Sequence, residues 1–183
     1  MTEDGWCVWI TGLPGSGKSV VSEALSRLLR KKSISVQLLS SDALREVLTP
    51  KPTYSLEERD MVYVTLAYVA KLLTQNGVNI VIDATGNLRK YRDDARRQIP
   101  NFIEAYLECP LKVCIEREAR RRETYKAPKQ IYAKAAKGKA PTVPGIGQSY
   151  EQPLNSDITI DTTKNTPEQA AKKIMNIILE RYG

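Results

Sequence analysis

Runs of apolar residues, separated by polar and turn-forming segments, predict a chain that alternates between short strands and helices. Residues 78–83 form a nearly continuous apolar run rich in β-branched side chains, as expected for a parallel strand that is buried on both faces. Residues 6–11 also form a short buried run. In all, the pattern predicts five strands, at residues 6–11, 36–40, 78–83, 102–108 and 158–161.

Helical spacing and capping signals predict a helix after almost every strand. The first helix follows residue 18 and ends near residues 30–32, and a short helix begins at Ser41 or Asp42, either of which we expect to cap it. A capping box from Ser55 to Glu58 predicts a long helix that Gly77 ends. Three further helices are expected at residues 89–98, after Pro110 and after the capping residue Thr166. This order predicts one α/β domain over residues 1–183, with a doubly wound, five-stranded parallel sheet and helices on both faces.

Between the first strand and the first helix, the sequence Gly-Leu-Pro-Gly-Ser-Gly-Lys-Ser fits the phosphate-binding P-loop pattern. Glycines let backbone N–H groups converge on one anion, and the following helix adds the positive end of its dipole. Lys18 is expected to reach the β- and γ-phosphates of ATP, and the Ser19 hydroxyl to hold Mg²⁺. The predicted ATP contacts are Gly12, Leu13, Pro14, Gly15, Ser16, Gly17, Lys18, Ser19 and Val20.

Two carboxylates follow predicted strands, and the carboxyl ends of parallel strands are where ligands bind in such sheets. Asp42 follows the second strand and Asp83 ends the third. Either can hold Mg²⁺ or accept a proton from an attacking hydroxyl, so Asp42, Asp83 and Lys18 are the candidate catalytic residues, and Ser19 with Asp42 the candidate metal ligands. The alternative for each aspartate is a simple helix cap.

Three further residues are candidates for binding a second, anionic substrate. Arg45 lies one helical turn after Asp42, which suits a two-pronged grip on a phosphate or sulfate, and Arg59 is a second such arginine. The alternative for Arg59 is a surface ion pair with Glu58 or Asp60. Tyr54 can stack on a base or pack against the start of the long helix.

The amino-acid composition narrows the range of possible sites, reactions and partners. The 183 residues include three cysteines without paired spacing and no histidine, so a zinc site and histidine-dependent catalysis are not expected, and the cysteines are interpreted as buried thiols. A net charge of +7 favours an anionic partner, either a nucleotide or a nucleic acid. No apolar run reaches membrane-spanning length and no signal peptide is apparent, so we expect a cytoplasmic protein with no membrane partner.

Residues 117–139 are strongly basic, and the glycine- and proline-rich residues 140–153 follow them. One interpretation is a lid, over about residues 117–153, that closes on the phosphates of ATP and a second anion. The other is a solvated charged face.

With these motifs the chain resembles the adenylylsulfate kinases, P-loop kinases that move the γ-phosphate of ATP to the 3′-hydroxyl of adenosine 5′-phosphosulfate (APS). The resemblance covers nearly the whole chain, and its most specific parts are Ile-Tyr-Ala-Lys-Ala from Ile131 and Tyr-Glu-Gln-Pro from Tyr150. It implies ATP and Mg²⁺ as cofactors, small nucleotide substrates, and a role in sulfate assimilation. It places Asp42 at the transfer site and Arg117 at ATP. The implied acceptor contacts are Asp42, Arg45, Tyr54, Arg59, Asn87, Lys134 and Ile146.

The departures from the family pattern fall mostly on the acceptor side. Val62 replaces an asparagine, Asn87 lies where the family has a Ser-Pro-Tyr turn, and Val143 replaces an aromatic residue. A kinase of another nucleotide-linked metabolite, of an RNA 5′-end or of seryl-tRNA therefore stays open as an alternative. A GTPase switch is disfavoured because the guanine-binding Asn-Lys-x-Asp signature is absent, and a motor ATPase because 183 residues are few for a motor domain. A homodimer is one assembly open to the chain.

Overall fold

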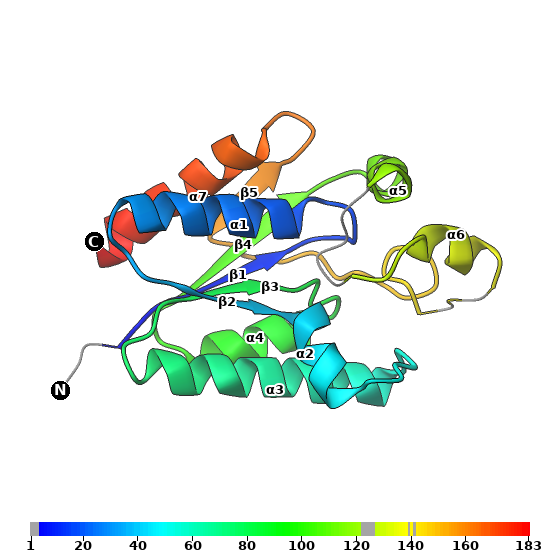
Figure 1. The fold of residues 1–183 in the computed structure, drawn as a ribbon, viewed down its shortest axis with the longest axis horizontal. Helices are drawn as coiled ribbons and strands as arrows, with labels where there is room; N and C mark the ends of the chain where they lie inside the picture. The colour runs from blue at the N-terminus through cyan, green and yellow to red at the C-terminus, as the bar shows by residue number, and fades with distance from the viewer. Residues whose placement is uncertain (1–3, 122–126, 139, 141) are drawn as a thin grey trace.

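A computed structural model of the chain describes residues 4–121, 127–138, 140 and 142–183. Its five strands form one sheet in which every neighbouring pair is parallel, in the order β2-β3-β1-β4-β5 (Figure 1). The predicted strands are confirmed, although three of them are one or two residues shorter than expected. The strands are β1 (Cys7–Thr11), β2 (Gln37–Ser40), β3 (Ile80–Asp83), β4 (Phe102–Glu108) and β5 (Ile158–Asp161).

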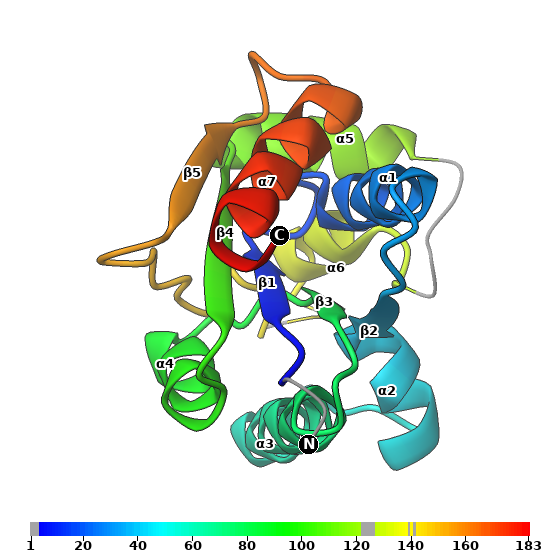
Figure 2. The ribbon, with the colours of Figure 1, turned by 90° about the vertical axis from the view of Figure 1, so that its left-hand side faces the viewer.

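Helices cover both faces of this sheet, which confirms the doubly wound α/β arrangement. Helices α1 (Lys18–Lys31) and α7 (Pro167–Tyr182) lie side by side on one face, and α3 (Leu56–Thr74) and α4 (Arg89–Gln98) cover the other (Figures 1 and 2). Three shorter helices, α2 (Ser41–Leu48), α5 (Leu111–Arg120) and α6 (Ile131–Ala136), lie toward the carboxyl ends of the strands (Figure 1). Loops and short helices therefore gather at one edge of the sheet.

The two faces of the central strand β1 supply two separate apolar cores. Val8 and Ile10 belong to the core under α1 and α7, whereas Cys7 and Trp9 belong to the core under α3 and α4. This alternation follows from the two-residue period of a strand. Because both faces are covered, β1 is fully buried, and the loop that follows it starts from a rigid support.

Two of the predicted helix starts need correction. Helix α2 is capped by Ser40, whose hydroxyl accepts hydrogen bonds from the Asp42 and Ala43 amides, so neither Ser41 nor Asp42 is the cap. Ser55 caps α3 by accepting from the Glu58 amide, but the Glu58 side chain does not complete the predicted capping box. That carboxylate has other partners, described below. The capping box at Thr166 is confirmed, with both of its hydrogen bonds present.

In its described residues, the segment predicted to form a lid contains the end of α5 and the short helix α6. Helix α6 and the loop around Val143 pack on α5 through a third small apolar cluster, which includes Cys114 and Tyr132. The basic residues that were expected at positions 122, 126 and 139 lie outside the described residues. All three cysteines are buried and free, as expected. Within the described ranges no helix is long and apolar enough to span a bilayer.

Candidate active site

The loop from Gly12 to Ser19 joins β1 to α1 in a conformation that only glycine accepts at two positions. Gly15 has φ 84°, and a Cβ atom there would lie 2.4 Å from the Cys114 carbonyl oxygen. Gly17 has φ 103° and immediately precedes α1. The chain therefore turns sharply enough to direct the amino end of α1, with its free N–H groups, at one point beyond the sheet.

Lys18 is folded back over this loop. Its Nζ donates hydrogen bonds of 3.1 Å to the carbonyl oxygens of Gly12 and Leu13. Burial lowers the pKa of Lys18, and the negative charges of Asp83 and Asp42 oppose that effect. The ammonium group thus lies between the loop and two carboxylates, where an anionic phosphate chain would complete its neutralisation.

The two candidate carboxylates both lie beside Lys18, and Asp83 has the closer link to Ser19. β3 pairs with β1, with Asp83 opposite Ile10, and the neighbouring Ser19 hydroxyl lowers the pKa of the Asp83 carboxyl against the larger effect of burial. Burial raises the pKa of Asp83. Burial also raises the pKa of Asp42, and repulsion from Asp83 adds to it. Two carboxylates that repel each other beside a hydroxyl form an oxygen-rich group suited to a hard divalent cation.

A cavity of about 560 Å³ opens beyond the carboxyl ends of β1, β2 and β3 and brings most of the predicted site residues together. Its lining includes these predicted residues: Pro14, Gly15, Gly17, Lys18, Ser19, Val20, Asp42, Arg45, Tyr54, Arg59, Asp83, Arg117 and Lys134. The lining thus combines the phosphate loop with three residues predicted to bind the second substrate, Arg45, Tyr54 and Arg59, which lie on α2, α3 and the loop between them. Of the remaining predicted residues, Gly12, Leu13 and Ser16 belong to the loop without lining the cavity.

Asn87 and Ile146, predicted as acceptor contacts, do not line this cavity. Asn87 is fully buried, its Nδ2 donates to the Ser149 carbonyl at 3.1 Å, and its own carbonyl accepts from the Glu151 amide. It therefore fastens the segment near residue 150 to the turn after β3. Ile146 is exposed in a turn whose amides donate to the Val143 carbonyl. The resemblance gave both residues a ligand role, but the backbone around them directs their side chains elsewhere.

At the acceptor end, two arginines approach one tyrosine. The guanidinium carbons of Arg45 and Arg59 lie 5.0 and 5.9 Å from the centre of the Tyr54 ring. Arg59 does not form the surface ion pair considered as its alternative. Its Nη2 donates to the Thr142 carbonyl at 2.6 Å and its Nε to the Tyr54 carbonyl at 3.2 Å. These contacts join α3 to the lid segment and leave a positively charged, aromatic-lined end to the cavity.

Two lining or adjoining residues were missed by sequence reasoning. The Arg121 guanidinium lowers the pKa of both Lys18 and Asp42, so its charge faces the phosphate end of the cavity. Arg121 was one of several consecutive arginines, and nothing in the sequence separated it from its neighbours. Tyr132 on α6 donates from its hydroxyl to the Pro14 carbonyl at 2.8 Å, which connects the lid helix to the phosphate loop.

Arg117 lies where the first helix of the basic segment approaches the loop after β5. Its Nη1 donates to the Thr162 hydroxyl at 3.0 Å and its Nη2 to the Thr162 carbonyl at 2.8 Å. The flat guanidinium group is thereby held in place, and Arg117 lines the same cavity as the phosphate loop. This position is compatible with the predicted contact with ATP.

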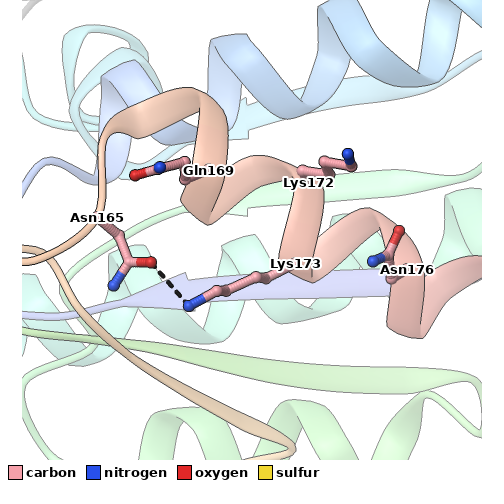
Figure 3. A pocket seen from close by; sticks show the side chains of 5 residues that line it. All are labelled: Asn165, Gln169, Lys172, Lys173 and Asn176. Atoms are coloured by element: carbon pink, nitrogen blue, oxygen red, sulfur yellow. Dashed lines mark hydrogen bonds between the residues drawn. The ribbon is translucent and has the colours of Figure 1, made fainter.

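A second hollow lies on the outer face of α7, and its lining includes neither a carboxylate nor any part of the phosphate loop. Polar side chains surround it, and the Lys173 ammonium donates to the Asn165 side-chain oxygen at 2.7 Å (Figure 3). The residues drawn there are Asn165, Gln169, Lys172, Lys173 and Asn176. They are surface groups, so the cavity beside Lys18 is the candidate active site.

Comparisons with known proteins agree with this geometry. A model of the adenylylsulphate kinase family matches residues 4–161. The adenylyl-sulfate kinase of Halothermothrix orenii is 37% identical over 98% of this chain and 92% of its own, and that of Rippkaea orientalis 36% identical over 95% and 91%. The APS kinase of Mycobacterium tuberculosis, solved in complex with AMPPNP and APS, superimposes with a TM-score of 0.85 at 30% identity. That superposition covers 96% of this chain and 98% of the other.

The match extends across the phosphate loop, both carboxylates and the acceptor end of the cavity, and its identities of 30% and above span nearly the whole length of each protein. The fold, the ATP-dependent phosphotransferase class and the resemblance drawn from the sequence motifs are all confirmed. This chain belongs to the adenylylsulphate kinase family.

Proposed function

We propose that this enzyme transfers the γ-phosphoryl group of ATP to the 3′-hydroxyl of APS, forming 3′-phosphoadenosine 5′-phosphosulfate for sulfate assimilation. One observation carries the proposal. A single cavity has a phosphate loop at one end and the pair Arg45 and Arg59 around Tyr54 at the other, with Asp42 between them. Two anionic nucleotides can therefore bind in it with the γ-phosphate of one next to a hydroxyl of the other.

On the ATP side, the loop amides and Lys18 bind the phosphate chain. Lys18 already has two weak carbonyl partners, and a charged phosphate oxygen is a stronger acceptor than either. The Arg121 and Lys134 side chains add positive charge from the lid side. Because phosphoryl transfer demands positioning and charge neutralisation more than a strong base, a chain without histidine can supply what the reaction needs.

The oxygen donors beside Lys18 fit a magnesium ion. The Ser19 hydroxyl lies beside the Asp83 carboxyl, whose pKa is raised by burial, so a cation at this point would relieve an unfavourable buried charge. From the sequence, Asp42 and Ser19 were the predicted metal ligands. The link between Ser19 and Asp83 favours Asp83 with Ser19 instead. When bound, the ion would neutralise charge on the β- and γ-phosphates.

Asp42 is then free to act on the acceptor. It lies at the amino end of α2, one helical turn before Arg45, and lines the cavity between the two ends. An acceptor hydroxyl can donate a hydrogen bond to its carboxylate, which orients the oxygen toward the γ-phosphate and receives its proton. Arg45 and Arg59 hold the anionic phosphosulfate, and the Tyr54 ring packs on the adenine.

A kinase of a different hydroxyl acceptor is the alternative, and one observation favours it. The buried Val143 lines the cavity where the family pattern has an aromatic residue, so one stacking surface for adenine is missing. The excess positive charge also suits an RNA 5′-end or seryl-tRNA.

Product analysis separates these acceptors. The purified protein is incubated with ATP and Mg²⁺, with and without APS, and the products are identified by mass spectrometry. We expect rapid formation of the 3′-phosphorylated product only when APS is present. If ATP binds but APS is not phosphorylated, the proposal is wrong, and the same assay is repeated with tRNA and with RNA that carries a 5′-hydroxyl.

We also propose that the enzyme forms a homodimer through the outer face of α3. Spacings of three and four residues align four exposed apolar side chains on that face: Met61, Val64, Tyr68 and Leu72. Glu57 lies near one end of this row and Lys71 near the other. An antiparallel second copy, centred on Val64, would bring each Glu57 beside the partner's Lys71 and cover the apolar row. Light scattering should give a dimer that Val64→Lys converts to a monomer; a monomeric wild type at all concentrations would contradict the proposal.

A further inference from the structure

Tyr54 has a backbone conformation that a tyrosine rarely adopts. It lies in the loop between α2 and α3 with φ 57°, in the left-handed region that disfavours bulky side chains. Such a conformation persists only when the surrounding contacts hold it, and it tends to be found at functional sites. The contacts that hold Tyr54 therefore indicate how this end of the cavity is constructed.

The carboxylate of Glu58 provides most of those contacts. Its Oε2 accepts from the Thr53 amide at 2.6 Å, from the Thr53 hydroxyl at 2.7 Å and from the Tyr54 amide at 3.0 Å. Its Oε1 accepts from Nη1 of Arg45 at 2.6 Å, within a buried ion pair. One carboxylate thus binds a loop from one side and an arginine of α2 from the other.

These partners of Glu58 line the cavity, whereas Glu58 itself does not. The same carboxylate that restrains the Tyr54 amide also orients Arg45, whose guanidinium lies 5.0 Å from the centre of the Tyr54 ring. Arg59, next along α3, donates to the Tyr54 carbonyl. Tyr54 and the two arginines are therefore fixed relative to one another through α3.

A simple helix-capping role does not explain this arrangement. In a capping box the Glu58 side chain would accept from the Ser55 amide. Here the Ser55 amide donates to the Thr53 hydroxyl instead, at 3.3 Å. The Glu58 carboxylate is directed past the helix end, toward the cavity wall.

The Glu58 carboxylate is ionised when it accepts these hydrogen bonds. Burial raises the pKa of Glu58, but the hydrogen bonds from Thr53 and Tyr54 and the charge of Arg45 outweigh burial, so the pKa lies below its usual value. An ionised carboxylate forms stronger hydrogen bonds than a neutral amide does. Replacing Glu58 by glutamine should therefore loosen the loop and the arginine together.

We propose that Glu58 is the positioning residue of the acceptor end of the cavity: it holds Tyr54 and Arg45 as one preorganised surface for the base and the anionic group of the acceptor. The identity of that acceptor rests on the proposed function. The restraint of Tyr54 and Arg45 by Glu58 is independent of which acceptor binds.

The kinetic test compares Glu58→Gln with Glu180→Gln, a control that makes the same chemical change at an exposed position of α7. Initial rates are measured with ATP and APS each varied. We expect KM for APS to rise about 10-fold or more in Glu58→Gln, because a charged hydrogen bond to Arg45 is lost, while KM for ATP changes less than about twofold. Glu58→Asp, which keeps the charge, should recover part of the loss.

Hydrogen exchange supplies a readout that needs no acceptor. The Thr53 and Tyr54 amides should exchange about 10-fold faster or more in Glu58→Gln, and at the wild-type rate in Glu180→Gln. If the wild type does not phosphorylate APS, the proposed function fails, but the exchange rates still decide whether Glu58 restrains this loop.

Unchanged exchange rates and an unchanged KM for APS would overturn the inference. Equal rises of both KM values with a large fall in Tm would also overturn it, because they would indicate a general structural role. Should Glu58→Gln fail to fold, Glu58→Asp carries both measurements.

Discussion

The hydroxyl of Ser19 lies beside the carboxylate of Asp83, where the phosphate loop meets the third strand, and it favours the ionised form of that carboxyl. This contact indicates that the two aspartates beside Lys18 have different roles. Asp83 is associated with the loop and the predicted metal position, and Asp42 lies at the start of α2 on the way to the acceptor end. Several measurable consequences depend on that division.

Asp83→Asn and Asp42→Asn should change different kinetic constants. Asp83→Asn is expected to raise the Mg²⁺ concentration for half-maximal rate about 10-fold, because it removes one charged oxygen ligand. Asp42→Asn is expected to lower kcat about 100-fold with little change in KM for ATP, since it removes the group that orients the hydroxyl. Initial rates over a matrix of Mg²⁺ and ATP concentrations test both. A raised Mg²⁺ requirement in Asp42→Asn alone would reverse the two roles.

Lys18→Ala should lower kcat/KM about 100- to 1,000-fold, because it removes a buried positive charge aimed at the transferred group. The fold should survive, since the hydrogen bonds of Lys18 go to two carbonyls of the loop rather than to the core. Steady-state rates and circular dichroism are measured on the same preparation. Lys31→Ala is the control, because Lys31 is exposed at the far end of the same helix. Activity like that of the wild type in Lys18→Ala would contradict the assignment of the phosphate loop.

Asp42→Asn should also make the protein more stable at neutral pH. The pKa of Asp42 is raised by burial and by Asp83, so its ionised form is less favourable in the folded state than in the unfolded state. That penalty is fully present above the raised folded pKa and disappears below the ordinary pKa of an aspartate. We expect the variant to melt a few degrees higher than the wild type at pH 8, and the difference to vanish in acid. Equal Tm values of the variant and the wild type at pH 8 would show that the ionised Asp42 does not destabilise the fold.

Val143→Phe should improve acceptor binding if adenine occupies this part of the cavity. An added aromatic face contributes about 0.5–1.5 kcal/mol, so KM for APS should fall about two- to tenfold while KM for ATP stays constant. Val143 is buried, and a larger side chain can strain its neighbours, so Tm is measured in parallel. Val47→Phe, at an exposed site on α2, is the control. An intact fold with an unchanged KM for APS would place the base elsewhere.

The phosphate loop and the sheet were predictable because their signals are local. The loop follows from eight consecutive residues, and strands such as β4 follow from short apolar runs with definite boundaries. The rule that ligands bind at strand carboxyl ends then brought Asp42 and Asp83 to one site. What this rule lacks is the order of the strands, which depends on how the crossovers pack.

Most of the corrections come from that missing information. Only the pairing of β3 with β1 brings Asp83 beside Ser19. Asn87 appeared to be a ligand because of where it lies in the sequence, but the segment near residue 150 returns over it and uses its amide. Glu58 matched a capping pattern that it does not complete, because Arg45, 13 residues earlier in the chain, offers a stronger partner. Contacts between distant segments are decided by tertiary packing, which no local pattern records.

The hydrogen bonds from Lys18 to the carbonyls of Gly12 and Leu13 also affect the thermodynamics of nucleotide binding. The loop is already ordered when ATP arrives, so its conformational entropy is lost during folding rather than during binding. A substitution in the loop such as Gly15→Ala, whose Cβ would meet the Cys114 carbonyl oxygen, should then weaken nucleotide binding and the fold by related amounts. Affinity for ATP in this enzyme is to that extent a property of how well β1 and α1 are packed.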